Sequence, residues 1–135
     1  MTLSSLFPDT HIALAHGNGG RLMRELITAL FARHLANEHL NTEVDAADLP
    51  LSSAEGVVMM TTDGFTVEPL EFPGGNIGSL AVHGTINDLA VSGALPRYLS
   101  LNAFIEEGLE VALLDRVLAS MAAACRESNV QVVAG

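Results

Sequence analysis

The chain has 135 residues, of which 49% are hydrophobic and only 16% are charged, and its 16 acidic residues outnumber 6 basic ones, all of them arginine. The formal net charge of −10 excludes nucleic acid and anionic membranes as partners, because both require a basic surface. The lack of lysine excludes a Walker A lysine and a Schiff-base lysine. So apolar a composition predicts that a partner covers a sizeable face, in a homodimer or against a further domain.

The single cysteine, Cys125, excludes an intrachain disulfide and indicates a reducing compartment. The N-terminal segment lacks the basic and continuously apolar regions of a signal peptide, and no apolar run approaches the length of a membrane span. We therefore expect a cytoplasmic protein without a membrane segment.

In chain order, residues 1–16 are predicted to form an extended arm, and residues 16–20 a flexible glycine-rich loop. The loop leads into a helix whose apolar residues recur at helical spacing until about Asn37. Residues 41–49 are ambiguous between a loop and a strand around Thr42, Val44 and Ala46. Residues 50–56 are typical of a turn.

Residues 57–62, Val-Val-Met-Met-Thr-Thr, predict a short buried strand between turn residues. A loop over 69–75 follows. Asn76 is the expected N-cap of a second helix that runs to about Ser92, with Gly93 at its C-terminal cap.

Residues 98–105 alternate as in a strand with one apolar face. A third helix is predicted from about Glu110, and a last strand opens at 130–133. The apolar stripe of that third helix comprises Val111, Leu114, Val117, Leu118, Met121, Ala122 and Cys125. The order of elements predicts a single-domain α/β two-layer sandwich, with helices on one face of a mixed sheet.

Two glycines interrupt the second predicted helix, and each costs about 1 kcal/mol relative to alanine. Close approach of another backbone or of a ligand at Gly78 and Gly84 would offset that cost. Asn87 and Asp88 follow near the helix end, where an acidic residue opposes the helix dipole. Tight packing and ligand binding both stay open as explanations.

Asp63 follows the predicted strand directly and precedes Gly64, so it either forms a turn or points into a ligand crevice. The loop Gly17-Asn18-Gly19-Gly20 has the composition of an anion-binding turn at a helix N-terminus. Asp45 and Asp48 lie in a polar stretch, and solvated loop acids are the default interpretation for both.

Cys125 is expected to pack in the core and not to act as a nucleophile. The histidines show no zinc-binding spacing, because His34 and His39 are five residues apart. His83 is either a ligand contact or a satisfied buried imidazole.

These motifs, taken together, resemble the N-terminal domain of hydrogenase maturation factors of the HypE family. The resemblance covers essentially the whole chain and rests on the following segments: HGNGGR at 16–21, VDAADL at 44–49, TTDGFTV at 61–67, PLEFPGGNIGSLAVHGTINDLAVSGALPRYLSL at 69–101, IEEGLE at 105–110 and VVAG at 132–135. The family belongs to the ATP-binding superfamily of aminoimidazole ribonucleotide (AIR) synthetase.

The resemblance implies a site for ATP and Mg²⁺. Acids at Asp45, Asp63 and Asp88 would hold Mg²⁺ on the ATP phosphates, and Asn87 would accompany Asp88. The loop of Gly17, Asn18, Gly19 and Gly20 would close over the nucleotide. It also implies a PurM-like domain whose sheet closes into a barrel with that of a second copy.

The implied reaction of the full-length enzyme is ATP-dependent dehydration of a thiocarboxamide on a C-terminal cysteine to a thiocyanate, which supplies the cyanide ligand of NiFe hydrogenases. Implied partners are the carbamoyltransferase HypF and a HypC–HypD complex. The family pattern continues past residue 135 into a second domain that carries this cysteine, so the catalytic residue stays unknown. We therefore expect this chain alone to be inactive.

Two other functions remain open. The chain could be a non-catalytic dimerisation or docking module, as its low charge suggests. It could also belong to another ATP-dependent synthetase or kinase of the same superfamily, although the long segment at 69–101 speaks against that.

Overall fold

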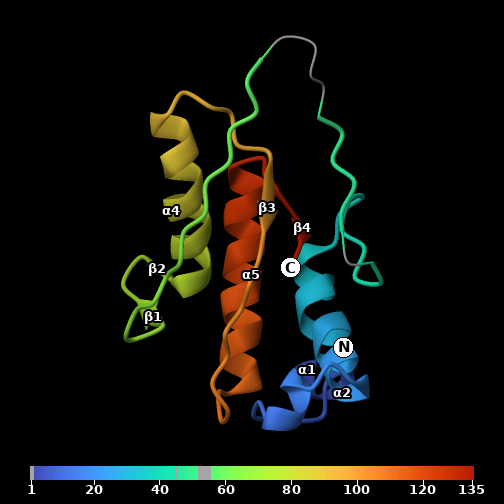
Figure 1. Cartoon of the computed structure of the whole chain (residues 1–135). Helices are drawn as coiled ribbons and strands as arrows, with labels where there is room; N and C mark the ends of the chain where they lie inside the picture. The colour runs from blue at the N-terminus through green and yellow to red at the C-terminus, as the bar shows by residue number, and fades with distance from the viewer. Residues whose placement is uncertain (1, 45, 52–55) are drawn as a thin grey trace.

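The computed structural model describes residues 2–44, 46–51 and 56–135 of the chain. Three helical rods lie side by side, with the helix at 111–127 in the middle and short strands beside it (Figure 1). The arm holds a helical turn, α1 (Leu3–Leu6), and a 3₁₀ turn, η1 (Leu14–Gly17). The described chain is thus a mixed α/β fold in which helices dominate.

The first predicted helix is confirmed as one continuous rod built from α2 (Arg21–Leu26), the π-helical η2 (Ile27–Ala32) and α3 (Arg33–Leu35). Asn37 terminates it. Its side-chain amide donates to the carbonyls of Leu35 at 3.0 Å and Val132 at 2.7 Å, and its side-chain oxygen accepts from two following backbone N–H groups. One side chain therefore stops the helix and ties it to the last strand.

The second predicted helix is α4 (Ile77–Val91), and its cap is the predicted Asn76. The Asn76 side chain accepts from the backbone N–H of Gly78 at 2.9 Å, and the Asn76 N–H donates to the hydroxyl of Ser79 at 3.1 Å. Gly93 follows the helix with φ of +81°, a conformation that glycine adopts without strain. The cap is stabilising because it satisfies N–H groups that the helix leaves unpaired.

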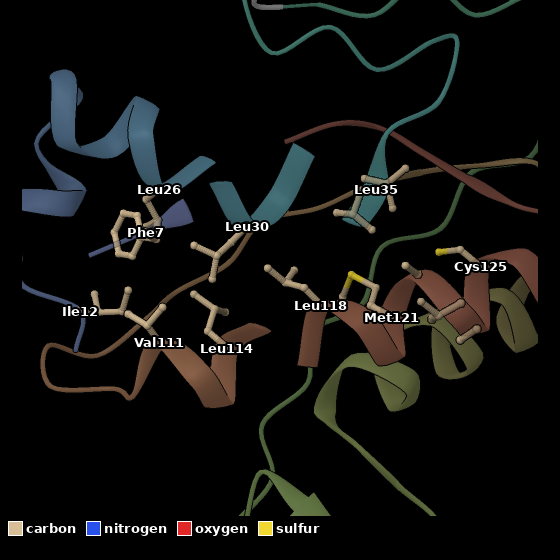
Figure 2. Packing of buried hydrophobic residues seen from close by; sticks show 14 of the residues in the cluster. Phe7, Ile12, Leu26, Leu30, Leu35, Val111, Leu114, Leu118, Met121 and Cys125 are labelled. Carbon is tan, nitrogen blue, oxygen red and sulfur yellow. The ribbon is translucent and has the colours of Figure 1, made fainter. Parts of the chain in front are cut away.

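The third predicted helix is α5 (Val111–Glu127), and it forms the centre of the core. All seven residues of the predicted apolar stripe are buried, including Cys125. Figure 2 shows Phe7, Leu26 and Leu30 of the N-terminal segment facing Val111, Leu114 and Leu118 of α5. This cluster packs the N-terminal segment against the helix α5 near the C-terminal end of the chain.

The described residues form two separate two-stranded sheets in place of the single mixed sheet that the sequence predicts. An antiparallel pair, β1 (Glu71–Phe72) and β2 (Gly75–Asn76), forms a hairpin that we had expected to be a loop. A parallel pair joins β3 (Tyr98–Ser100) to β4 (Gln131–Ala134). The strand predicted over 98–105 stops at Ser100, although the Leu101 N–H still donates to the Ala134 carbonyl at 2.8 Å. No barrel closes within the described part of the chain.

The prediction of a buried strand over 57–62 is wrong for this chain. The segment contains no strand, and the side chains of Val57 and Met60 are 89% and 93% exposed. A strand exists only where a neighbour accepts its hydrogen bonds, and none of the described strands pairs with this segment. No strand forms around residues 42–46 among the described residues either, and Asp45 lies outside them.

Candidate functional site

The glycine-rich loop lies on the surface between η1 and α2. Gly17, Asn18 and Gly19 are exposed, and Gly19 has φ of +70°, which favours glycine. A β-carbon at Gly17, Gly19 or Gly20 would meet no atom within 4 Å, so packing does not require glycine at these positions. The backbone groups of this loop are therefore accessible to a ligand.

The loop ends at Gly20, which is the N-cap of the helix that starts with α2 and makes no side-chain capping bond. The first N–H groups of a helix lack partners within the helix and attract negative charge. An exposed glycine backbone beside such a helix start can accept an anionic group. This geometry agrees with the predicted role of residues 17–20 without testing it.

Asp63 lies in an exposed segment, and its Oδ1 accepts the N–H of Gly64 at 2.7 Å. This contact matches the turn-forming interpretation of the Asp-Gly pair. Asn87 and Asp88 are both exposed near the end of α4. The Asp88 carbonyl accepts the hydroxyl of Ser92 at 2.8 Å, a contact that leaves its carboxylate free to face solvent.

Asp45, the remaining acid of the predicted magnesium site, lies outside the described residues, and Asp48 is exposed. Among the residues described, no three His, Cys, Asp or Glu side chains come together as a metal site. The structure thus leaves the predicted site as separate acids on separate segments. Whether they converge on a ligand remains a prediction.

The two glycines inside α4 are explained by packing. A β-carbon at Gly78 would lie 2.3 Å from the Val117 carbonyl oxygen of α5, and one at Gly84 would lie 2.4 Å from the ring of Phe65. Both distances are too short for real atoms, so each glycine allows a close approach. The cost of these glycines therefore needs no ligand to offset it.

Phe65 is a residue whose role the sequence analysis did not recognise. Its ring lies on Gly84, so the segment after Asp63 packs against the helix that carries Asp88. Figure 1 shows this segment descending beside α4 toward β1. Asp63 is two residues before Phe65, and Asp88 is one helical turn after Gly84, so one aromatic contact packs the segment of Asp63 against the helix of Asp88.

A cavity of about 370 Å³ borders the start of the glycine loop at Gly17, and sequence reasoning missed it. Its wall is mainly apolar and combines side chains from the first helix, such as Met23 and Phe31, with Leu101, Ile105 and Val132. His16 and Gly17 also line it. Such a lining suits hydrocarbon better than phosphate.

Two ion-pair groups brace the elements around α5. The Nε and Nη2 atoms of Arg116 each donate to a carboxylate oxygen of Glu71 at 2.9 Å, which ties the β1–β2 hairpin to α5. These bonds lower the pKa of Glu71 and raise that of Arg116. At the other side of α5, Asp115 binds Arg33 and lies 2.6 Å from Nε2 of His34.

Cys125 is 6% exposed, and burial raises the pKa of its thiol. Its place in the buried hydrophobic cluster confirms the prediction that Cys125 serves packing. The side chain of His83 is exposed on α4, so the alternative of a satisfied buried imidazole is wrong for this chain.

Comparison with known proteins identifies a family and similar relatives. The family described as AIR synthase related protein, N-terminal domain, matches residues 44–135. Carbamoyl dehydratase HypE of Azotobacter vinelandii is 52% identical over 124 residues, which cover 92% of this chain and 36% of that relative. The chain therefore spans about a third of the length of the curated relatives it matches.

Solved structures give the same result. A crystal structure of the hydrogenase maturation protein HypE in complex with ATP superposes with a TM-score of 0.85 at 52% identity, over 90% of this chain and 36% of that one. A structure of a HypE–HypF complex matches with a TM-score of 0.58 at 45% identity, over 86% and 35% of the two chains. Within the described residues, no helix combines the length and apolarity needed to cross a lipid bilayer.

Proposed function

Because the chain belongs to the AIR synthase related family, as its N-terminal domain, we propose that it binds ATP together with Mg²⁺. The observation that carries the proposal is the likeness to a HypE structure in complex with ATP, at 52% identity and a TM-score of 0.85. The exposed backbone of residues 17–20 supports it, because phosphate groups bind exposed N–H groups at a helix start.

Within this proposal, Asp45, Asp63 and Asp88 hold the metal, and Asn87 contributes an amide beside Asp88. The donors are carboxylate and amide oxygens, which suit Mg²⁺, and Asp63 and Asp88 are exposed to a ligand. When bound, Mg²⁺ supplies positive charge against the phosphates. The Phe65–Gly84 contact supports a common site, because it holds the segments of Asp63 and Asp88 together.

We further propose that the domain serves a HypE-type carbamoyl dehydratase. There, a phosphoryl group of ATP is transferred to the amide oxygen of a thiocarboxamide on a C-terminal cysteine, with ADP as the leaving group. Departure of that oxygen as inorganic phosphate, with loss of both amide protons, then leaves a thiocyanate. The role of this chain is to bind the nucleotide and orient its phosphates. Cys125 is not the reacting cysteine, because it is buried within α5.

The proposed partners are a second copy of the chain, a HypF-type carbamoyltransferase and a HypC–HypD complex. The similarity to the HypE–HypF structure supports the second of these. The exposed apolar side chains over 57–60 support the first, because a neighbouring copy would cover them.

Titration calorimetry of the chain with MgATP tests the site. We expect binding in the unaltered chain and at least tenfold weaker binding in Asp63→Asn and Asp88→Asn, since each loses a charged metal ligand. Asp48→Asn, an exposed acid from the same polar stretch as Asp45, is the matched control. Equal affinity in all four proteins would reject the assignment of these acids.

A second candidate function is a module that only assembles. It is favoured by Phe104, whose side chain is 100% exposed, and by Val57 and Met60. Sedimentation combined with the MgATP titration separates the two, because both functions allow a dimer, whereas an assembly module dimerises without nucleotide and fails to bind MgATP. A monomer that binds MgATP would exclude it.

A further inference from the structure

His16 is a buried polar side chain directly before the glycine loop, with 4% of its surface exposed. The backbone N–H of Ala13 donates to its Nδ1 at 2.9 Å. Because Nδ1 accepts, the neutral ring carries its proton on Nε2, which donates to Oδ2 of Asp9 at 3.1 Å. The ring of Phe7 packs against the imidazole at a centroid distance of 5.4 Å.

These contacts close the turn from which the loop starts. The N–H of His16 donates to the Ala13 carbonyl at 2.9 Å, so Ala13 and His16 exchange hydrogen bonds in both directions. The preceding arm is fixed to the start of α5, since Ile12 N–H donates to the Leu109 carbonyl at 2.8 Å and Val111 N–H to the Thr10 carbonyl at 2.9 Å. The turn is therefore a rigid base under an exposed loop.

Packing alone does not call for histidine here. An apolar side chain of similar size would fill the space beside Phe7, but it would leave the Ala13 N–H without its acceptor and Asp9 without its donor. Asp9 is 51% exposed at its side chain, so its bond reaches from the surface to a buried ring. Both polar atoms of the ring thus serve the geometry of the turn that leads to Gly17.

We propose that His16, braced by Asp9, is a positioning residue that sets the course of the Gly17–Gly20 loop and thereby its closure on nucleotide phosphates. The consequence for nucleotide rests on the proposed function, whereas the effect on the loop does not. His16 touches no substrate in this scheme, and it acts through the backbone of the loop.

Three substitutions test separately the two hydrogen bonds of the imidazole, one with the Ala13 N–H and one with Asp9. In His16→Asn, the amide oxygen takes the place of Nδ1 and keeps an acceptor for Ala13. In His16→Gln, the longer side chain reaches toward Asp9 and leaves the Ala13 N–H without that acceptor. Asp9→Ala removes only the brace, and His11→Asn is the matched control, because His11 is an exposed histidine of the same arm.

The effects are measured in the 135-residue chain by two methods. NMR gives backbone amide exchange and ¹⁵N relaxation, and calorimetry gives the affinity for MgATP. We expect His16→Gln to speed exchange at Ala13 about tenfold, to lower the order parameters of residues 17–20, and to weaken MgATP about fivefold. His16→Asn should restore most of each value. Asp9→Ala should change them less and in the same direction, and His11→Asn should change none.

Unchanged order at residues 17–20 in both His16→Gln and Asp9→Ala would overturn the proposal. If His16→Gln loosens α5 as well, the order of residues 17–20 in Asp9→Ala decides whether the proposal holds. The Asp9 side chain is half exposed, so its removal leaves the core intact. A loop that loosens in a chain without MgATP affinity would support the positioning role and reject the proposed function. A loosened loop with unaltered affinity would overturn its link to nucleotide.

Discussion

The helix α5 and the segment at 57–60 are both rich in apolar residues, yet they differ completely in burial. Residues of the α5 stripe are at most 9% exposed, whereas Val57, Val58, Met59 and Met60 are 89%, 65%, 45% and 93% exposed. A helix satisfies its own backbone and needs only side-chain neighbours, which this chain provides. An extended segment also needs a partner for its backbone, and the described chain does not provide one.

The largest contrast is expected from truncating one apolar side chain in each region. Leu118→Ala in α5 should lower the free energy of unfolding by about 3 kcal/mol, because it leaves a cavity among buried neighbours. At protein concentrations where the chain is monomeric, Met60→Ala should change it by less than about 0.5 kcal/mol, because this side chain is exposed. Urea denaturation followed by circular dichroism gives both values, and a comparable loss in Met60→Ala would show that residues 57–60 are buried in solution.

The close approach of α4 to α5 at Gly78 predicts the next largest loss of stability. Gly78→Ala should destabilise the chain by about 2 kcal/mol, because the new β-carbon would press on the Val117 carbonyl and force α4 away from α5. Gly56→Ala, where a β-carbon would meet nothing within 4 Å, is the control. Thermal unfolding of the pair would contradict the packing explanation if both changes were neutral.

Loss of a helix cap should have a smaller effect. Asn76→Ala removes the acceptor for the N–H groups at the start of α4 and should cost about 1 kcal/mol. Asn76→Asp keeps an acceptor oxygen and should retain most of the stability. The same thermal measurement applies, and equal losses in the two variants would argue against a capping role.

The smallest effect is expected at the surface pair of Glu71 and Arg116. Because this pair lowers the pKa of Glu71 in the folded chain, it stabilises the fold above the pKa of the unfolded carboxyl. That contribution disappears as the pH falls through the lowered folded value. An NMR titration of the Glu71 carboxyl should show a higher pKa in Arg116→Gln, and an unchanged pKa would contradict the pairing.

Sequence reasoning succeeded where local rules determine structure. The helices were predicted from the period of their apolar residues, the α4 cap from Asn76, and the burial of Cys125 from its place on the α5 stripe. These features depend on neighbours within a few turns of the chain. The family resemblance was likewise readable, because its motifs are contiguous segments.

What failed depends on contacts between distant residues. The segment over 57–62 has the composition of a buried strand, but composition does not supply a partner. Gly84 was ambiguous because its neighbour, the ring of Phe65, lies 19 residues away in sequence. The buried state of His16 depends on Asp9, Ala13 and Phe7 together, and no spacing rule indicated it.

The glycine loop and the acids belong to a third category, because their chemistry requires a ligand. The structure places Asp63 and Asp88 on segments that one aromatic contact holds together, and it leaves their carboxylates exposed.

The central claim is that this chain binds ATP through Mg²⁺. It is tested most directly by the melting temperature of the chain with and without ATP, each in the presence and absence of Mg²⁺. A ligand at about 100 times its Kd stabilises a protein by about 2.7 kcal/mol, which raises the melting temperature by several degrees. We predict a rise that requires ATP and Mg²⁺ together. An unchanged melting temperature at millimolar MgATP would contradict the claim.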